Sequence, residues 1–174
     1  MTFIDIHSHM DFKDFDTDRE DIISQMKKNK IITLTNTLNR ENYEYTLSIF
    51  EKYAEVVKVT PGLYPQDAEK ISDKDFEDYL KLIKKNKDKI LAIGEIGLDR
   101  KWTSDEKLFE KQIIRFKQII EFAIKIDKAI IIHTRQAEEE VLNIIEEFKT
   151  KYPNYNKYVL QCFSGKKNLI NKII

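Results

Sequence analysis

The three histidines of this chain all lie in or directly after short apolar runs. His7 and His9 belong to the run FIDIHSH at residues 3–9, and His133 follows the apolar residues 129–132. Successive side chains of a β-strand point to opposite faces, so two histidines separated by one residue project the same way from the end of a strand. One cation could contact both imidazoles, and the pattern therefore favours a metal site.

A carboxylate occupies a similar position further along the chain. Glu95 lies in IGEIGLD at residues 93–99, directly after an expected strand and between glycines that allow close backbone approach. Taken alone, Glu95 fits a loop or helix-capping carboxylate, and His133 fits a hydrogen-bonded core histidine. Together with the histidine pair they form a nitrogen and oxygen donor set suited to Zn²⁺, Mn²⁺ or a similar ion. Cys162 is the only cysteine, which excludes an internal disulfide and a cysteine zinc site.

Short apolar runs alternate with longer amphipathic segments, which predicts an α/β fold with a parallel sheet. We expect strands near residues 3–6, 31–35, 56–60, 90–94, 129–132 and 158–162. We expect helices near residues 18–29, 41–53, 73–87, 105–127 and 136–150, with a further helix beginning in 166–174. Ligands bind at the carboxyl edge of such sheets, where the candidate residues should meet.

Length and composition predict one domain over residues 1–174. A (β/α)8 barrel takes eight units and about 250 residues, so we expect a TIM-barrel-like chain with about six βα units and strands seven and eight missing. The chain has 30 basic and 30 acidic residues, so net charge gives no general attraction to nucleic acid. The N-terminus lacks a signal-peptide pattern and no apolar run approaches roughly 20 residues, which predicts a cytoplasmic protein without a membrane partner.

Several segments occur together in a characteristic order. They are IDIHSHMD at 4–11, GEIGLD at 94–99, IHTR at 132–135 and CFSG at 162–165, with Gln112 and Phe116 in the intervening helix. In these segments the chain resembles the TatD-like metal-dependent hydrolases, a family of metal-ion deoxyribonucleases on an amidohydrolase-like TIM barrel. The resemblance spans nearly the whole chain.

The resemblance also implies roles for individual residues. His7 and His9 would bind one metal ion, Glu95 would bridge two ions, and His133 would bind the second. Two such ions lower the pKa of a bridging water and clamp a phosphodiester, so hydroxide can attack phosphorus without a covalent enzyme intermediate. Arg135 could contact a phosphate, although a surface salt bridge accounts for it equally well.

The chain departs from the family pattern at three places. Gln161 precedes CFSG where members usually carry a histidine ligand of the second metal, and its amide oxygen is a neutral, weaker donor. Tyr64, in GLYP at 62–65, stands where members have a substrate-contacting histidine; tyrosine donates one hydrogen bond but carries no positive charge near neutral pH. The last family ligand, an aspartate after strand seven, would lie beyond residue 174.

Three interpretations stay open at this point. The first is a deoxyribonuclease that uses one or two divalent ions (Zn, Mg or Mn), with Glu95 as catalytic residue, Gln161 as a further ligand, and Tyr64 and Arg135 contacting DNA. The second is a catalytically impaired paralogue that serves binding or assembly. The third is a hydrolase of another small ester or amide. An open six-unit barrel would expose two parallel edges, and a homo-oligomer is one way to cover them.

Overall fold

The computed structural model describes residues 1–166 and 169, in which strands and helices alternate as predicted. The strands are β1 (Phe3–Ser8), β2 (Ile31–Asn36), β3 (Val57–Thr60), β4 (Ala92–Asp99), β5 (Ala129–Arg135) and β6 (Tyr158–Leu160). The helices are α1 (Arg19–Asn29), α2 (Arg40–Phe50), α3 (Pro65–Ala68), α4 (Asp73–Lys85), α5 (Glu106–Lys125) and α6 (Glu138–Lys151), with 3₁₀ turns η1 (Lys13–Phe15) and η2 (Glu51–Tyr53). The α/β class is confirmed, whereas the helix expected in 166–174 falls almost wholly outside the described residues.

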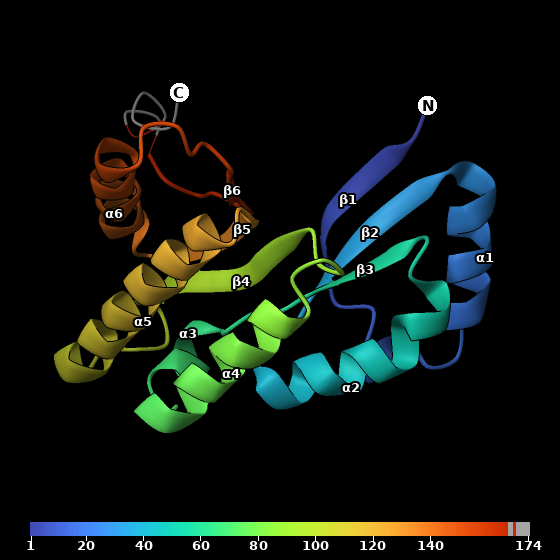
Figure 1. Ribbon diagram of the computed structural model, residues 1–174, viewed down its shortest axis with the longest axis horizontal. Helices are drawn as coiled ribbons and strands as arrows, with labels where there is room; N and C mark the ends of the chain where they lie inside the picture. Colours follow the sequence, from blue (N-terminus) through green and yellow to red (C-terminus); the bar gives the residue numbers. More distant parts are fainter. Residues whose placement is uncertain (167–168, 170–174) are drawn as a thin grey trace.

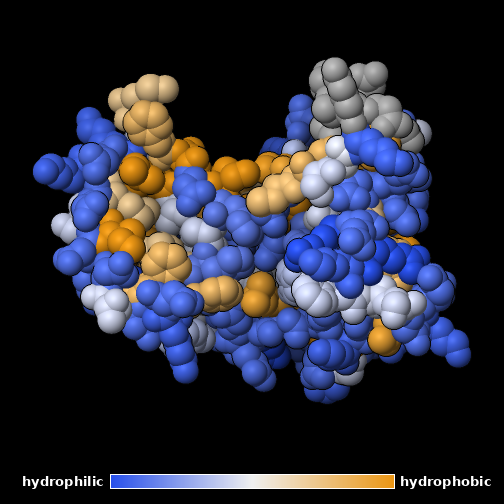
Figure 2. All heavy atoms as spheres, turned by 180° about the vertical axis from the view of Figure 1, so that it is seen from behind, coloured by the Kyte–Doolittle hydropathy of each residue, from blue (hydrophilic) through white to orange (hydrophobic). Residues whose placement is uncertain are grey.

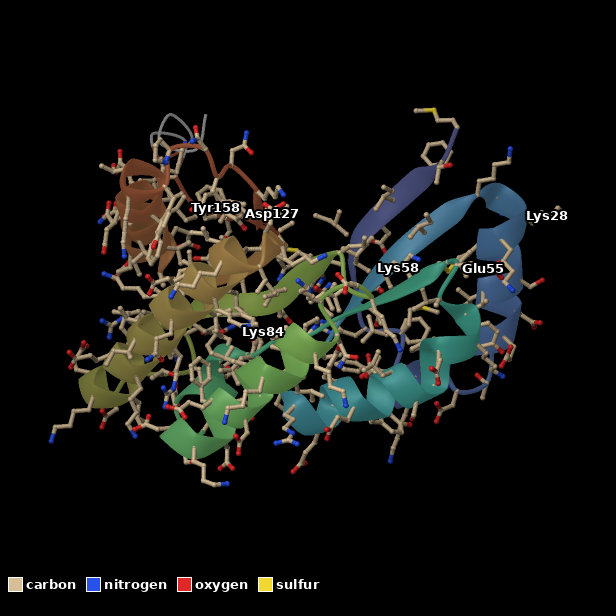
Figure 3. The ribbon with its side chains drawn as sticks, in the orientation of Figure 1. Lys28, Glu55, Lys58, Lys84, Asp127 and Tyr158 are labelled. Carbon is tan, nitrogen blue, oxygen red and sulfur yellow. The ribbon has the colours of Figure 1, made fainter. Side chains whose placement is uncertain are left out.

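The strands form two three-stranded parallel sheets, β1-β2-β3 and β4-β5-β6, rather than one continuous sheet. The sheets meet at the segment after β3, where Leu63 bridges Ile96 and the Pro61 carbonyl accepts from the Gly94 N–H at 2.8 Å. Figure 1 shows the strands as an open arc, with β1 and β6 at opposite ends and the helices on its outer side. Charged helix side chains, Lys28 of α1 among them, lie on the outside (Figure 3).

Helix starts and buried faces follow local chemistry. Asn39 caps α2, Ser72 caps α4 and Asp105 caps α5, each side chain accepting from backbone N–H groups that the first helical turn leaves free. On α5, Phe109 and Phe116 are each 1% exposed, and burying a side chain of this size stabilises the fold by about 1.5–3 kcal/mol. These contacts hold the helices against the strands that carry the candidate residues.

Three strands that carry candidate residues extend further than predicted. β1 continues to Ser8 and therefore includes His7. β4 continues to Asp99 and therefore includes Glu95, and β5 continues to Arg135 and includes His133. The predicted strand ends at 6, 94 and 132 are wrong. Glu95 lies near the middle of β4 and His133 lies in the carboxyl half of β5, instead of in the loops that follow.

The glycines of β4 explain the error at the end of that strand. Glycine reads as a strand terminator in a sequence, but here it allows β4 and β5 to approach closely where the register shifts between Ile93 and Ile96. A Cβ at Gly94 would lie 2.6 Å from the Ile131 Cβ. At Gly97, φ is +152° and a Cβ would lie 1.9 Å from the His133 carbonyl oxygen. Both glycines therefore serve the strand pairing.

The open side of the arc carries exposed apolar side chains. Phe3, Ile4 and Ile6 of β1 are 57%, 61% and 39% exposed. Figure 2 shows hydrophobic surface along the hollow of this side, between the N-terminal strand and the opposite rim. Within the described residues, no helix is long and apolar enough to cross a membrane.

Candidate metal centre

Glu95 is the point at which imidazoles from both sheets meet. Its Oε2 lies 3.5 Å from His7 Nε2 and 3.3 Å from His133 Nδ1, and its Oε1 lies 3.4 Å from His9 Nε2. Glu95 is 3% exposed. One ligand atom from each of His7, His9 and Glu95 lies within 4.8 Å of the others, a spacing at which one cation could contact all three. The structure thus brings together four residues that the sequence predicted would converge.

The end of β1 positions the histidine pair. His7 is in the strand and His9 one residue beyond it, and the pairing with β2 shifts register between Asp5 and Ser8. The two imidazoles pack edge to face with centroids 4.9 Å apart, and His9 also stacks on Phe12 at 4.7 Å. Both rings are therefore held by aromatic neighbours as well as by their backbone.

A hydrogen bond to the backbone determines the tautomer of His9. Its Nδ1 lies 2.8 Å from the Asn36 carbonyl oxygen, which can only accept, so Nδ1 carries the hydrogen. The Nε2 of a neutral His9 then presents a lone pair to the Glu95 carboxylate. Two acceptors that face each other in a buried site need a proton or a cation between them.

His133 also needs an added proton or a cation beside it, for a different reason. Its Nε2 lies 3.1 Å from Asp99 Oδ2, while its Nδ1 faces Glu95. Both carboxylates accept, and a neutral imidazole carries a single hydrogen, so one contact again requires an extra proton or a cation. A carboxylate behind a histidine is the arrangement that orients imidazole ligands of metals.

Asp99 was not predicted as a site residue. It is fully buried at the end of β4, four residues after Glu95. Residues separated by an even number share one face of a strand, so the alternation would have pointed to Asp99 if the strand had been extended to its true end.

Electrostatics at the centre favour positive charge between these groups. Burial alone would raise the pKa of Glu95, but the nearby imidazoles of His133, His7 and His9 lower that pKa far below its usual range. Burial lowers the pKa of His9 and of His133, and contact with Glu95 outweighs burial and raises both. The cluster therefore attracts cations, either protons or a metal ion.

Gln161 also reaches this centre. It follows β6, its backbone N–H donates to the Ile132 carbonyl at 3.1 Å, and its side-chain Nε2 donates to Glu95 Oε2 at 2.9 Å. Gln161 Oε1 and His7 Nε2 are buried and have no hydrogen-bond partner among the described residues. A half-turn of the amide exchanges its oxygen and nitrogen. Unpartnered nitrogen and oxygen atoms beside a carboxylate fit a divalent cation.

The two predicted substrate-contacting residues lie in different places. The Tyr64 ring packs edge to face on His133 at 4.9 Å, and its hydroxyl is 3.5 Å from Asp99 Oδ2. Burial and the carboxylates of Asp99 and Glu95 raise the pKa of Tyr64 to about 12, so its hydroxyl stays a neutral donor. Arg135 is exposed at the end of β5. Tyr64 therefore belongs to the centre and Arg135 to its rim.

A buried network supports Asp99 from behind. The Asp99 backbone N–H donates to Gln112 Oε1 at 2.9 Å. Gln112 Nε2 donates to Glu69 Oε1 at 2.5 Å and to Thr103 Oγ1 at 2.9 Å. Glu69 and Thr103 were not predicted, because neither lies in a motif or at a strand end.

Imidazole and carboxylate groups gathered at the carboxyl ends of parallel strands are typical of the active sites of α/β-barrel enzymes. Residues 4–174 match the family described as TatD related DNase, and the chain therefore belongs to this family.

Individual relatives agree with this assignment. The chain is 30% identical over 171 residues to the uncharacterized metal-dependent hydrolase MJ1582 of Methanocaldococcus jannaschii, covering 98% of this chain and 63% of that protein. It is 29% identical over 174 residues to the human deoxyribonuclease TATDN3, covering 94% and 61%. The structure of YjjV, a TatD homologue from Escherichia coli, superposes with a TM-score of 0.82 at 26% identity, covering 98% and 64%. The chain thus spans 61% to 64% of the length of these relatives.

Proposed function

We propose that this protein is a metal-dependent hydrolase that cleaves phosphodiester bonds of DNA. The observation that carries the proposal is the set of three imidazole nitrogens directed at the buried Glu95 carboxylate. Neutral tautomers of His9 and His133 leave acceptors facing acceptors there, which a divalent cation resolves. Relatives named as a metal-dependent hydrolase and as a deoxyribonuclease support the same reaction class.

The ligand sets follow from the contacts. His7 and His9 would hold one ion, His133 and Gln161 would hold a second, and Glu95 would be shared. Bound ions supply Lewis acidity and lower the pKa of water, which is the chemistry that phosphodiester hydrolysis needs. Nitrogen and oxygen donors of this kind suit Zn²⁺, Mn²⁺ or Mg²⁺.

The remaining residues orient the centre and the substrate. The Asn36 carbonyl fixes the tautomer of His9, and Asp99 fixes that of His133. Tyr64 offers a neutral hydroxyl beside His133, suited to donate to a phosphate oxygen. Arg135 offers a permanent positive charge at the rim, suited to a second phosphate contact.

The decisive experiment measures metal and cleavage on one preparation. Protein purified without nickel is analysed for metal content and then incubated with DNA, with and without EDTA. We expect bound divalent metal, cleavage that EDTA abolishes, and recovery when metal is restored. A Glu95→Ala preparation made in parallel reports contaminating nuclease. Cleavage that is equally fast in EDTA would contradict the proposal.

A second candidate function rests on Gln161 and Tyr64, which replace two histidines of the family pattern. A catalytically impaired binding or assembly protein would hold at most one weakly bound ion and show no turnover. A third candidate keeps the hydrolase but changes the substrate, since similar centres serve several ester and amide reactions. A screen of small esters against DNA separates it from the first.

The remaining expectations are proposals of smaller scope. The exposed apolar residues Phe3, Ile4 and Ile6 support a homo-oligomer that covers β1, which sedimentation would detect. A single hydrolase domain over residues 1–174 and a cytoplasmic location remain predictions.

A further inference from the structure

Trp102 stands out because it is exposed beside the metal centre. It is the only tryptophan in the chain and is 63% exposed, in the segment between β4 and α5. Its backbone N–H donates to Asp99 Oδ1 at 3.1 Å, while Oδ2 of the same carboxylate contacts His133. One buried side chain therefore ties the backbone that carries the indole to the centre.

Two cations lie over the indole. The Arg135 guanidinium carbon is 5.7 Å from the ring centroid and Lys101 Nζ is 5.0 Å from it. Arg135 is two residues after His133 on β5, so strand alternation directs both side chains to the same side of the sheet.

These cations remain available for another partner. Among the described residues, neither Arg135 nor Lys101 forms an ion pair. The neighbouring Arg100 behaves differently, because it forms two hydrogen bonds with Glu106, at 2.6 and 2.9 Å, and packs on Phe109. Positive charge without a counterion therefore gathers around Trp102 and not around Arg100.

The combination of an exposed aromatic face and unpaired cations suits one kind of ligand. Nucleobases stack on aromatic side chains, and the adjoining phosphates bind guanidinium and ammonium groups. A base paired within a duplex has both faces covered by its neighbours, whereas an unpaired base has a free face. The fold gains little from Trp102, whose ring is mostly exposed.

We propose that Trp102 and Arg135 form a nucleotide subsite beside the metal centre. An unpaired base stacks on the indole, and Arg135, assisted by Lys101, binds the adjoining phosphate. The inference rests on the proposed function and adds that this subsite selects unpaired nucleotides over intact duplex.

The single tryptophan makes the test direct, because all indole fluorescence comes from the subsite. The protein, loaded with divalent metal, is titrated with phosphorothioate oligo(dT), which resists cleavage. A phosphorothioate abasic oligomer and a closed duplex hairpin are titrated in parallel. We expect saturable quenching by oligo(dT), and little quenching by the abasic oligomer or the hairpin.

Variants are compared by the anisotropy of fluorescein-labelled oligo(dT). Trp102→Ala should weaken binding at least about fivefold, as expected for loss of one stacked base, and Trp102→Phe should retain part of the affinity. Arg135→Ala should weaken binding and reduce its salt dependence, whereas Arg135→Lys should preserve the salt dependence. Tyr45→Ala is the matched control, since Tyr45 is 55% exposed on α2 and should leave binding unchanged.

Two results would overturn the subsite: unchanged fluorescence with saturating oligo(dT), or wild-type affinity of Trp102→Ala. Cleavage of unmodified DNA by the wild-type protein is measured separately. Quenching without cleavage would support the subsite and reject the nuclease activity. Cleavage by the wild-type protein, together with wild-type DNA affinity of Trp102→Ala, would support the nuclease activity and reject the subsite.

Discussion

The two halves of the candidate metal centre share Glu95 but differ in the other side chains that face it. The half from the first sheet has two imidazoles, His7 and His9, whose nitrogens lie 3.5 and 3.4 Å from the carboxylate. The half from the second sheet has one imidazole, His133, and the amide of Gln161. Because imidazole is a stronger ligand than a neutral amide for ions such as Zn²⁺, the first half should bind metal more tightly.

The halves also differ in what supports them. His9 is held by a backbone carbonyl and a stacked Phe12, which depend on few side chains. His133 is held by Asp99, which is supported in turn by the side chains of Gln112 and Glu69. Substitutions at Gln112 or Glu69 should therefore weaken metal binding by the second half. Few side chains behind the first half could weaken its metal binding in the same way.

The largest effect is expected where the two halves join. Glu95→Ala should remove tight metal binding at both positions and reduce DNA cleavage by about 10³-fold or more, because metal catalysis contributes several kcal/mol. Metal content and initial cleavage rates measure the change. Glu110→Ala, an exposed position on α5, should leave both unchanged. Retention of full metal content in Glu95→Ala would exclude this carboxylate as a shared ligand.

Asp99→Asn should weaken metal binding in one half of the centre and leave the other half unchanged. Loss of the carboxylate behind a histidine ligand typically costs about 10–100-fold in metal affinity, and here the loss should fall on the His133 position alone. Calorimetric titration of metal into the chelator-treated protein would resolve the weaker and tighter sites. The exposed Asp88→Asn is the control. Equal weakening of both sites would contradict the independence of the halves.

Gln112→Leu tests the network behind the second half. The change leaves the buried Asp99 N–H without its partner and removes one of the two donors to Glu69 Oε1, the other being Thr103 Oγ1, so the free energy of unfolding should fall by about 1–3 kcal/mol. Urea denaturation measures it. The exposed Gln118→Leu on the same helix should change it by less than about 0.5 kcal/mol. A Gln112→Leu protein as stable as wild type would show that the network is dispensable.

The smallest expected effect is an increase in metal affinity. Gln161→His should supply the missing imidazole and tighten the second site by about tenfold, equivalent to about 1.4 kcal/mol. Gln161→Leu should weaken the same site, since it removes the oxygen donor. If neither variant alters the second binding step, Gln161 is not a ligand.

Much of the fold could be predicted from local pattern. The alternation of β-prone runs and amphipathic segments identified every strand from β1 to β6, because strand and helix periodicity depends on nearby residues. The sequence does not predict the short helix α3 or the true ends of β1, β4 and β5. Gly94 and Gly97 look like terminators in sequence, and their role in the close pairing of two strands appears only when β5 is beside them.

The residue types needed for a metal centre can be read from the chain. The sequence alone points to His7, His9, Glu95, His133 and Gln161, although Glu95 lies inside β4 and not after its end. Folding settled which nitrogen of each ring faces Glu95, and it revealed Asp99, whose partner His133 is 34 positions away. Hydrogen bonds between distant residues set tautomer and charge, and no local pattern encodes such partners.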